Sequence, residues 1–163
     1  MYGSNYNDTL TGDAGPNRIS GFGGKDTIAG GVDDDHLFGA DGDDTIRGGS
    51  GNDEVNGGAG IDTTSYANAP AAVIVDLSLF AASATGGDGD DWLSLTENVT
   101  GSRFADKVTA SAVANVVLGG AGDDTLLGLA GADKLDGQAG VDSVDGGIDV
   151  DTCIAETKTS CEL

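Results

Sequence analysis

Acidic residues recur at a fixed spacing of nine along this 163-residue chain, in one run from residue 8 to 62 and a second from 97 to 151. Asn17, Glu97 and Asn115 stand where the two runs lack aspartate. The recurring aspartates are Asp8, Asp26, Asp35, Asp44, Asp53, Asp62, Asp106, Asp124, Asp133, Asp142 and Asp151. A site whose ligands are all oxygen atoms, from carboxylates and from the carbonyls of a flexible backbone, favours Ca²⁺ over Zn²⁺ or Mg²⁺. The spacing therefore predicts a series of calcium sites.

Residue patterns typical of catalysis are missing from the sequence. The single histidine, His36, precedes Leu37 at an outward position, where we expect it to be solvent-exposed. The chain has no HExxH, GxSxG or P-loop motif. Paired carboxylates also act as the acid and the base of glycosidases, but here we expect them to be ligands of the cation. We expect no enzyme activity.

An apolar residue follows most of the acidic positions by two residues. The set is Leu10, Ile19, Ile28, Leu37, Ile46 and Val55 in the first run, and Val99, Val108, Val117, Leu126, Leu135, Val144 and Cys153 in the second, with Thr64 as a polar exception. Gly-Gly-x-Gly segments before the acids predict a six-residue turn and a three-residue strand. One inward side chain per nine residues cannot form a core alone, so the units must stack as a solenoid. Stacking aligns the aspartates, and cations between turns would remove their repulsion.

The charge balance limits the partners. With 28 acidic and seven basic residues the net charge is −21. Nucleic acid and anionic membranes would repel such a chain. No stretch reaches the roughly 18 apolar residues of a membrane span. We therefore expect cations as partners, with no nucleic acid and no membrane span.

Four segments follow one glycine-rich motif: "GGSGNDEVN" (48–56), "GGAGIDTTS" (57–65), "GGDGDDWLS" (86–94) and "GGAGDDTLL" (119–127). The motif resembles the hemolysin-type calcium-binding repeat GGxGxDxUx of the RTX family. The resemblance implies an all-β, right-handed parallel β-roll with two nonapeptides per coil and Ca²⁺ between turns n and n+2. It also implies a bacterial module that folds on Ca²⁺ binding outside the cell. Such a secreted module is a structural or secretion-assisting part of an exported protein, monomeric or the C-terminal part of a larger one.

Carried onto this chain, the resemblance pairs aspartates eighteen residues apart. The pairs are Asp8–Asp26, Asp26–Asp44, Asp35–Asp53, Asp44–Asp62, Asp106–Asp124, Asp124–Asp142 and Asp133–Asp151. These predict about seven ions, within a range of about five to ten. Turn carbonyls should complete each shell. The expected carbonyls are those of Gly21, Gly23, Gly39, Asp41, Gly48, Ser50, Gly57, Ala59, Gly119, Ala121, Gly128, Ala130, Gly137 and Ala139.

Five units replace the last glycine of Gly-Gly-x-Gly, with Tyr6, Asp33, Phe104, Val113 and Asp149. Aspartate tolerates the left-handed conformation that such a turn requires, whereas a β-branched residue does not. We therefore expect the unit at 110–118, which contains Val113, to lack a proper turn.

A different pattern separates the two runs. Apolar and other residues alternate from Val73 to Phe80, which predicts a strand longer than that of a nonapeptide. Val73 lies nine residues after Thr64, so this strand should continue the stack. The expected organisation is an array at 1–65, an irregular bridging coil at 66–100, an array at 101–154 and a cap at 155–163. The alternative is an extracellular ligand-binding or adhesin site in 66–100 that uses Tyr66 or Trp92.

The two cysteines, Cys153 and Cys161, lie near the C-terminus without metal-ligand spacing. Cys153 takes an inward position, where a buried thiol would be inert. Cys161 follows eight residues later and is able to fold back over the open end of the solenoid, which needs a cap. We predict a disulfide, which favours an oxidising, extracellular compartment. Typical RTX proteins generally lack cysteines, so the chain departs from the family here.

Overall fold

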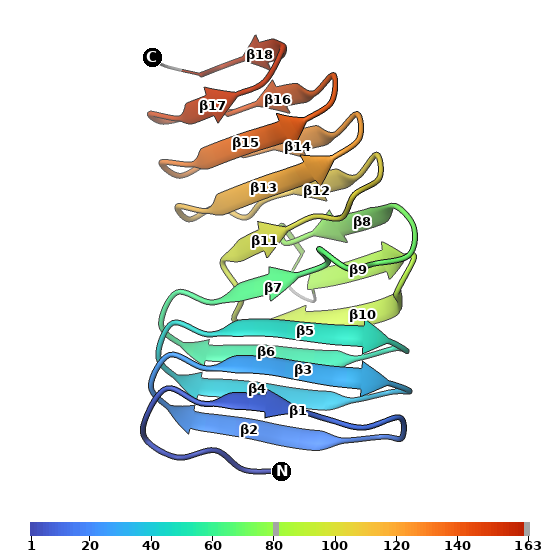
Figure 1. The fold of residues 1–163 in the computed structure, drawn as a ribbon. Helices are drawn as coiled ribbons and strands as arrows, with labels where there is room; N and C mark the ends of the chain where they lie inside the picture. Colours follow the sequence, from blue (N-terminus) through green and yellow to red (C-terminus); the bar gives the residue numbers. More distant parts are fainter. Residues whose placement is uncertain (80–81, 162–163) are drawn as a thin grey trace.

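The computed structural model describes residues 1–79 and 82–161, and these form strands and turns without a helix (Figure 1). The strands build two sheets that face each other. The eight-stranded sheet contains, in spatial order, β1 (Thr9–Thr11), β3 (Thr27–Val32), β5 (Thr45–Ser50), β7 (Thr63–Ser65), β11 (Asn98–Thr100), β13 (Val116–Ala121), β15 (Lys134–Ala139) and β17 (Thr152–Ile154). The ten-stranded sheet contains β2 (Arg18–Gly23), β4 (His36–Asp41), β6 (Glu54–Ala59), β10 (Gly89–Ser94), β9 (Ala82–Gly86), β8 (Val73–Asp76), β12 (Lys107–Thr109), β14 (Thr125–Leu127), β16 (Ser143–Asp145) and β18 (Thr157–Thr159).

Outside the 66–100 segment the chain passes from one sheet to the other with each nonapeptide. Two nonapeptides therefore complete a coil, and equivalent residues pair in parallel at a separation of eighteen, as Ile28 does with Ile46 and Leu37 with Val55. The prediction of a parallel β-roll is confirmed. Several strands are longer than the expected three residues, because the first residues of the glycine turn also pair with the next coil, as Ala40 does with Gly58.

The core is the column of inward side chains predicted by the nine-residue step. Ile19, Leu37 and Leu126 have no exposed surface. Leu10 is only partly buried because it lies in the first coil. Thr64, the polar exception, is buried and donates through its hydroxyl to the Thr96 hydroxyl (3.3 Å). Thr9, Thr27, Thr45 and Thr63 lie in register on the outer side of the eight-stranded sheet, where β-branched residues favour strands.

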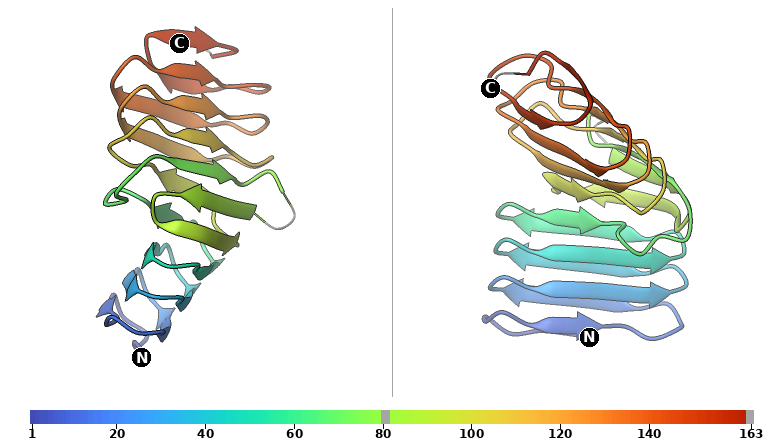
Figure 2. Two further views of the ribbon diagram at one scale, coloured as in Figure 1. Left: turned by 90° about the vertical axis from the view of Figure 1, so that its right-hand side faces the viewer. Right: turned by 45° about the horizontal axis from the view of Figure 1, so that its top comes forward.

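The segment between the arrays departs from the predicted order. β10, not β8, lies beside β6, with Leu93 opposite Val55. β9 then runs antiparallel between β10 and β8, and β8 pairs in parallel with β12 through Val75 and Val108. The prediction that the strand at Val73 continues the stack from the first array is therefore wrong in its order: β8 lies in the same sheet as β6, but β10 and β9 come between them. Figure 2 shows this green segment joining the two stacks.

The predicted long strand at 73–80 is also wrong, since β8 ends at Asp76. Val73, Val75 and Leu77 point inward as the alternation predicted, but Leu79 is exposed. Phe80 lies outside the described residues. The backbone leaves the strand here because Ser78 donates through both its amide and its hydroxyl to Asp76 Oδ1 (2.9 and 2.6 Å).

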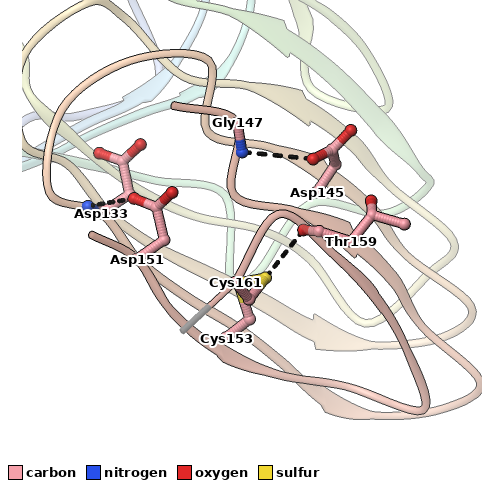
Figure 3. Close-up of a disulfide and its surroundings, with 7 residues drawn as sticks. All are labelled: Asp133, Asp145, Gly147, Asp151, Cys153, Thr159 and Cys161. Atoms are coloured by element: carbon pink, nitrogen blue, oxygen red, sulfur yellow. Dashed lines mark hydrogen bonds between the residues drawn. A yellow bond between two sulfur atoms is a disulfide. The ribbon is translucent and has the colours of Figure 1, made fainter. Parts of the chain in front are cut away.

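The C-terminal residues form a shortened last coil. β18 pairs with β16, and Glu156 Oε2 accepts the Asp142 amide hydrogen bond (2.9 Å) at a separation of fourteen residues. Cys153 and Cys161 are joined by a disulfide with their Cα atoms 5.8 Å apart, which confirms the prediction (Figure 3). The bridge therefore ties the end of the chain to β17. In the described part of the chain, no helix has the length and apolar character needed to cross a membrane.

Candidate metal centre

The recurring aspartates stack at the starts of the strands, one above another in successive coils. In pairs eighteen residues apart, the backbone amide of the first aspartate donates to Oδ1 of the second, as from Asp26 to Asp44 (2.7 Å) and from Asp124 to Asp142 (2.9 Å). All seven predicted pairs make this contact: Asp8–Asp26, Asp26–Asp44, Asp35–Asp53, Asp44–Asp62, Asp106–Asp124, Asp124–Asp142 and Asp133–Asp151. Aspartates of the two sheets form separate columns because the coil passes through each sheet once.

The second carboxylate oxygen is buried and has no hydrogen-bond partner within residues 1–79 and 82–161 in a group of these aspartates. The group is Asp26, Asp35, Asp44, Asp53, Asp62, Asp124, Asp133 and Asp142. A buried charged oxygen without a partner costs several times the net value of a hydrogen bond. So many in one small protein mark places where a cation belongs.

Glycine at the first motif position leaves room beside each of these oxygens. A Cβ added to Gly21 would clash with Asp26 Oδ2 and would lie 2.8 Å from the Gly39 carbonyl oxygen of the next coil. The same arrangement recurs at Gly119, where the added Cβ would clash with Asp124 Oδ2 and lie 2.8 Å from the Gly137 carbonyl oxygen. Carboxylate and carbonyl oxygens of successive coils thus converge where a side chain is missing.

The carbonyls predicted at the third motif position are partly engaged. Those of Asp41, Ala59 and Ala139 each accept a backbone amide from the preceding coil, with N–O distances of 2.8–2.9 Å. A carbonyl oxygen has a second lone pair, so these contacts leave coordination open. No three acidic, histidine or cysteine side chains converge anywhere in the described residues. Most ligands at each site must therefore be carbonyl oxygens, a donor set that suits Ca²⁺.

The electrostatics favour a positive charge beside these carboxylates. Burial and, to a smaller extent, the nearby Asp91 and Asp35 charges raise the pKa of Asp53 to about 7. Burial and neighbouring acidic residues likewise raise the pKa values of Asp62 and Asp124 to about 6. A bound divalent cation would reverse these shifts because it stabilises the ionised carboxylates.

Sequence reasoning missed Asp91. It is almost fully buried, and its Oδ1 accepts the Asp53 amide hydrogen bond (3.0 Å), so it takes the next place in the Asn17–Asp35–Asp53 column. The nine-residue step of the acidic positions, counted from Asp62, falls on residues 71, 80 and 89 and so misses it. The signal was the motif "GGDGDDWLS", in which Asp91 holds the ligand position.

The non-aspartate positions also lie in the columns. Glu97 Oε2 accepts the Asp62 amide hydrogen bond (2.9 Å), as an aspartate would. Asn17 donates through its side-chain amide to Asp35 Oδ1 (3.2 Å). Asn115 donates through its side-chain amide to the Glu97 carbonyl. The asparagine side-chain amide thus donates a hydrogen bond at a position where an aspartate would need a cation.

A second ladder, unforeseen in the sequence, runs at the preceding motif position. The Asn52 amide donates to Asp34 Oδ1 (2.7 Å), and the Asp90 amide donates to Asn52 Oδ1 (2.9 Å). Asp43 and Asp123 accept the amides of Ile61 and Val141 in the same way. These bonds join successive coils without any metal. Asparagine and aspartate before the ligand aspartate were the signal.

The two aromatic residues proposed for a ligand site in 66–100 lie in different surroundings. Trp92 is exposed on the outer side of β10, whereas Tyr66 is 3% exposed. The Tyr66 hydroxyl donates to Asp91 Oδ2 (2.9 Å). Tyr66 is therefore part of the core and not a surface for a ligand. Of the two aromatic residues on which that alternative rested, Trp92 alone is exposed.

Comparison with known families gives one result. A family model described as the RTX calcium-binding nonapeptide repeat matches in four copies, at residues 2–37, 29–64, 94–126 and 118–153. The matches cover both arrays and omit most of the 66–100 segment. No curated protein matches the chain.

Proposed function

Because this chain belongs to the RTX family of calcium-binding nonapeptide repeats, we propose that its Ca²⁺ binding and its folding are one event. The function that follows is a structural module of an exported protein, which stays unfolded at cytosolic calcium and folds outside the cell. We assign it no catalytic role.

The buried, unpartnered carboxylate oxygens are the observation that supports this proposal. Each requires neutralisation in the folded state, and none requires it in an open chain exposed to water. An ion that binds only where two coils are stacked favours the folded state by mass action. Without ions, repulsion within the columns opposes a core that receives one apolar side chain per nine residues.

We assign the side-chain ligands by motif position and by stacking. They are Asp8, Asp26, Asp35, Asp44, Asp53, Asp62, Asp106, Asp124, Asp133, Asp142 and Asp151. Asp44 stands between Asp26 and Asp62 and contacts both through amide–carboxylate hydrogen bonds. An aspartate placed in this way serves two neighbouring sites, so we expect the sites to fill cooperatively.

One observation on this chain supports an extracellular setting, and a general property of calcium modules agrees with it. Extracellular calcium modules work at around 10⁻⁴–10⁻³ M Ca²⁺, well above the concentration in a cytosol. The Cys153–Cys161 disulfide fits an oxidising compartment. Both match a module that folds after export. A calcium-driven gain of structure on the far side of the membrane would also assist secretion, because it prevents the chain from returning.

Small-angle scattering in chelator and in millimolar Ca²⁺ tests the proposal. In chelator we expect a radius of gyration near the roughly 40 Å of an unfolded chain of this length. In Ca²⁺ we expect a compact rod with a sharply smaller radius, and in Mg²⁺ no comparable change. A compact rod in chelator would contradict the proposal.

A further inference from the structure

In some of the recurring aspartates, hydrogen-bond donors contact the carboxylate oxygen that is unpartnered in the others. Three nonapeptides carry serine at the second motif position, where the consensus motif has glycine: Ser4 in the unit at 3–11, Ser102 in 101–109 and Ser111 in 110–118. Ser4 donates through its amide and its hydroxyl to Asp8 Oδ2 (2.6 and 2.8 Å). Ser102 donates through its amide to Asp106 Oδ2 (2.5 Å) and through its hydroxyl to Asp106 Oδ1 (2.8 Å). Both oxygens of Asp106 therefore have hydrogen-bond donors.

The same serines set a different turn. Ser102 Oγ accepts the Phe104 amide hydrogen bond (3.0 Å), and Ser4 Oγ accepts that of Tyr6 (3.2 Å). In ordinary units the second and fourth residues have positive φ, as do Gly49 (112°) and Gly51 (144°). Among the described residues, neither serine nor its fourth-position partner has positive φ. Serine thus folds a turn that needs no glycine at its fourth position and supplies two donors to its carboxylate.

In the third serine turn, the serine donates to an uncharged side chain. Ser111 donates through its amide and its hydroxyl to Asn115 Oδ1 (both 3.0 Å). Val113 here has no positive φ, which agrees with the expected loss of the glycine turn. Asparagine needs no cation, and serine satisfies its oxygen. The serine turn is therefore compatible with a site that carries no metal.

A tyrosine hydroxyl does the same at the far end of a column. Tyr66 donates to Asp91 Oδ2 (2.9 Å), while Asp91 Oδ1 accepts the Asp53 amide. Beyond Asp91 the antiparallel strand β9 replaces the next glycine turn. Asp8, Asp91 and Asp106 are each the first or last aspartate before a column ends or changes. These hydroxyl contacts therefore occur at column ends. Asp26, Asp44 and Asp124, which have an aspartate on either side in their columns, each keep a buried oxygen without a partner in the described residues.

We propose that Ser4, Ser102 and Tyr66 take the place of a cation and determine which turns of this repeat bind calcium. The inference rests on the calcium binding proposed above. It removes Asp8–Asp26 and Asp106–Asp124 from the seven predicted sites. Five remain: Asp26–Asp44, Asp35–Asp53, Asp44–Asp62, Asp124–Asp142 and Asp133–Asp151. Each array then begins with a turn that forms without calcium, on which the metal-dependent coils can stack.

Ion counting by native mass spectrometry separates the two kinds of turn. Asp106→Asn and Asp124→Asn are matched substitutions one coil apart. Folded Asp106→Asn should bind as many Ca²⁺ ions as the wild type, and Asp124→Asn should bind at least one fewer. Equal loss in both variants would overturn the inference and leave the calcium function standing. A wild-type chain that binds no Ca²⁺ would instead overturn the proposed function.

A gain-of-site variant tests the inference without removing a carboxylate. Ser102→Gly combined with Phe104→Gly restores Gly-Gly-x-Gly before Asp106 and frees its Oδ2, while Oδ1 keeps the Val73 amide hydrogen bond (2.8 Å), as Oδ1 of the other column aspartates keeps its amide. We expect one Ca²⁺ ion more than in the wild type. An unchanged ion count would show that the serine is not what excludes the metal. This variant decides the question if Asp106→Asn does not fold, as judged by circular dichroism.

Discussion

In the nonapeptide arrays, buried apolar residues such as Leu37 and Ile46 are nine positions apart. In the connecting segment, by contrast, Tyr66, Ala69 and Val73 are all buried within eight residues. The arrays thus bury little apolar surface per residue, and the segment at 66–100 buries more. Burial of apolar side chains therefore stabilises the connecting segment more, per residue, than it stabilises the arrays.

The aspartates of the two regions also differ in whether hydrogen bonds satisfy their carboxylate oxygens. Asp44 and Asp124 in the arrays each keep a buried oxygen without a partner in the described residues. Asp91 in the connecting segment has both oxygens satisfied by Tyr66 and the Asp53 amide. On the proposed mechanism, calcium dependence is therefore a property of the array turns and not of the whole solenoid.

The largest effect should come from an interior array aspartate. Asp44→Asn removes a charge that belongs to two ion sites. We expect the midpoint of the calcium titration to rise about a hundredfold, about tenfold for each site. Asp76→Asn is the control in the connecting segment, since the Asp76 carboxylate accepts hydrogen bonds from Ser78 and lies outside the aspartate columns. Similar midpoints for both variants would erase the distinction between the two regions.

Loss of the disulfide should have the next largest effect. In the chain-entropy account, a bridge between residues eight apart contributes about 2.5 kcal/mol. Cys161→Ser, which leaves Cys153 in place, should therefore lower the free energy of unfolding in saturating calcium by about that amount. Reductant should destabilise the wild type equally and leave the variant unchanged. Stability unaffected by reductant would mean that the cap does not depend on its bridge.

Tyr66→Phe tests the metal-free part of the comparison. The substitution removes the hydroxyl that donates to Asp91 and should cost about 1–2 kcal/mol in urea unfolding. Tyr6→Phe, at an exposed tyrosine, should have no such effect. The cost for Tyr66→Phe should persist in saturating calcium. If calcium abolished it, the connecting segment would depend on metal as the arrays do.

The smallest effect concerns pH in the absence of calcium. Burial raises the pKa of Asp53 from 3.8 to about 7. The folded state then holds a proton that the unfolded chain releases, so stability from this group is present below pH 3.8 and is lost as pH rises to about 7. In chelator, circular dichroism should therefore show more β-structure at pH 5 than at pH 7.5. A smaller β signal at pH 5 would contradict this sign.

The repeat made much of this structure predictable. One inward residue every nine positions identifies Ile19, Leu37 and Val55 as core, because each coil repeats the same backbone path. The step failed at Val73, since the place of β8 depends on the antiparallel strand β9, which no periodicity encodes. Asp91 was missed for the same reason, although its own motif marks it.

Local chemistry within the turns was harder to foresee. The motif treats Asp8 and Asp26 alike, and only the hydrogen bonds of Ser4 separate them. A serine in place of the second glycine was visible in the sequence. Its effect was not, because the direction of a hydroxyl follows from the fold of the turn.

Circular dichroism during a calcium titration tests the central claim most directly, that the aspartate columns couple calcium binding to folding. Starting from chelator, the β signal should rise sigmoidally at around 10⁻⁴–10⁻³ M Ca²⁺. Chelator should reverse the change, and Mg²⁺ should not reproduce it. A full β signal in chelator, unchanged by added calcium, would contradict the account.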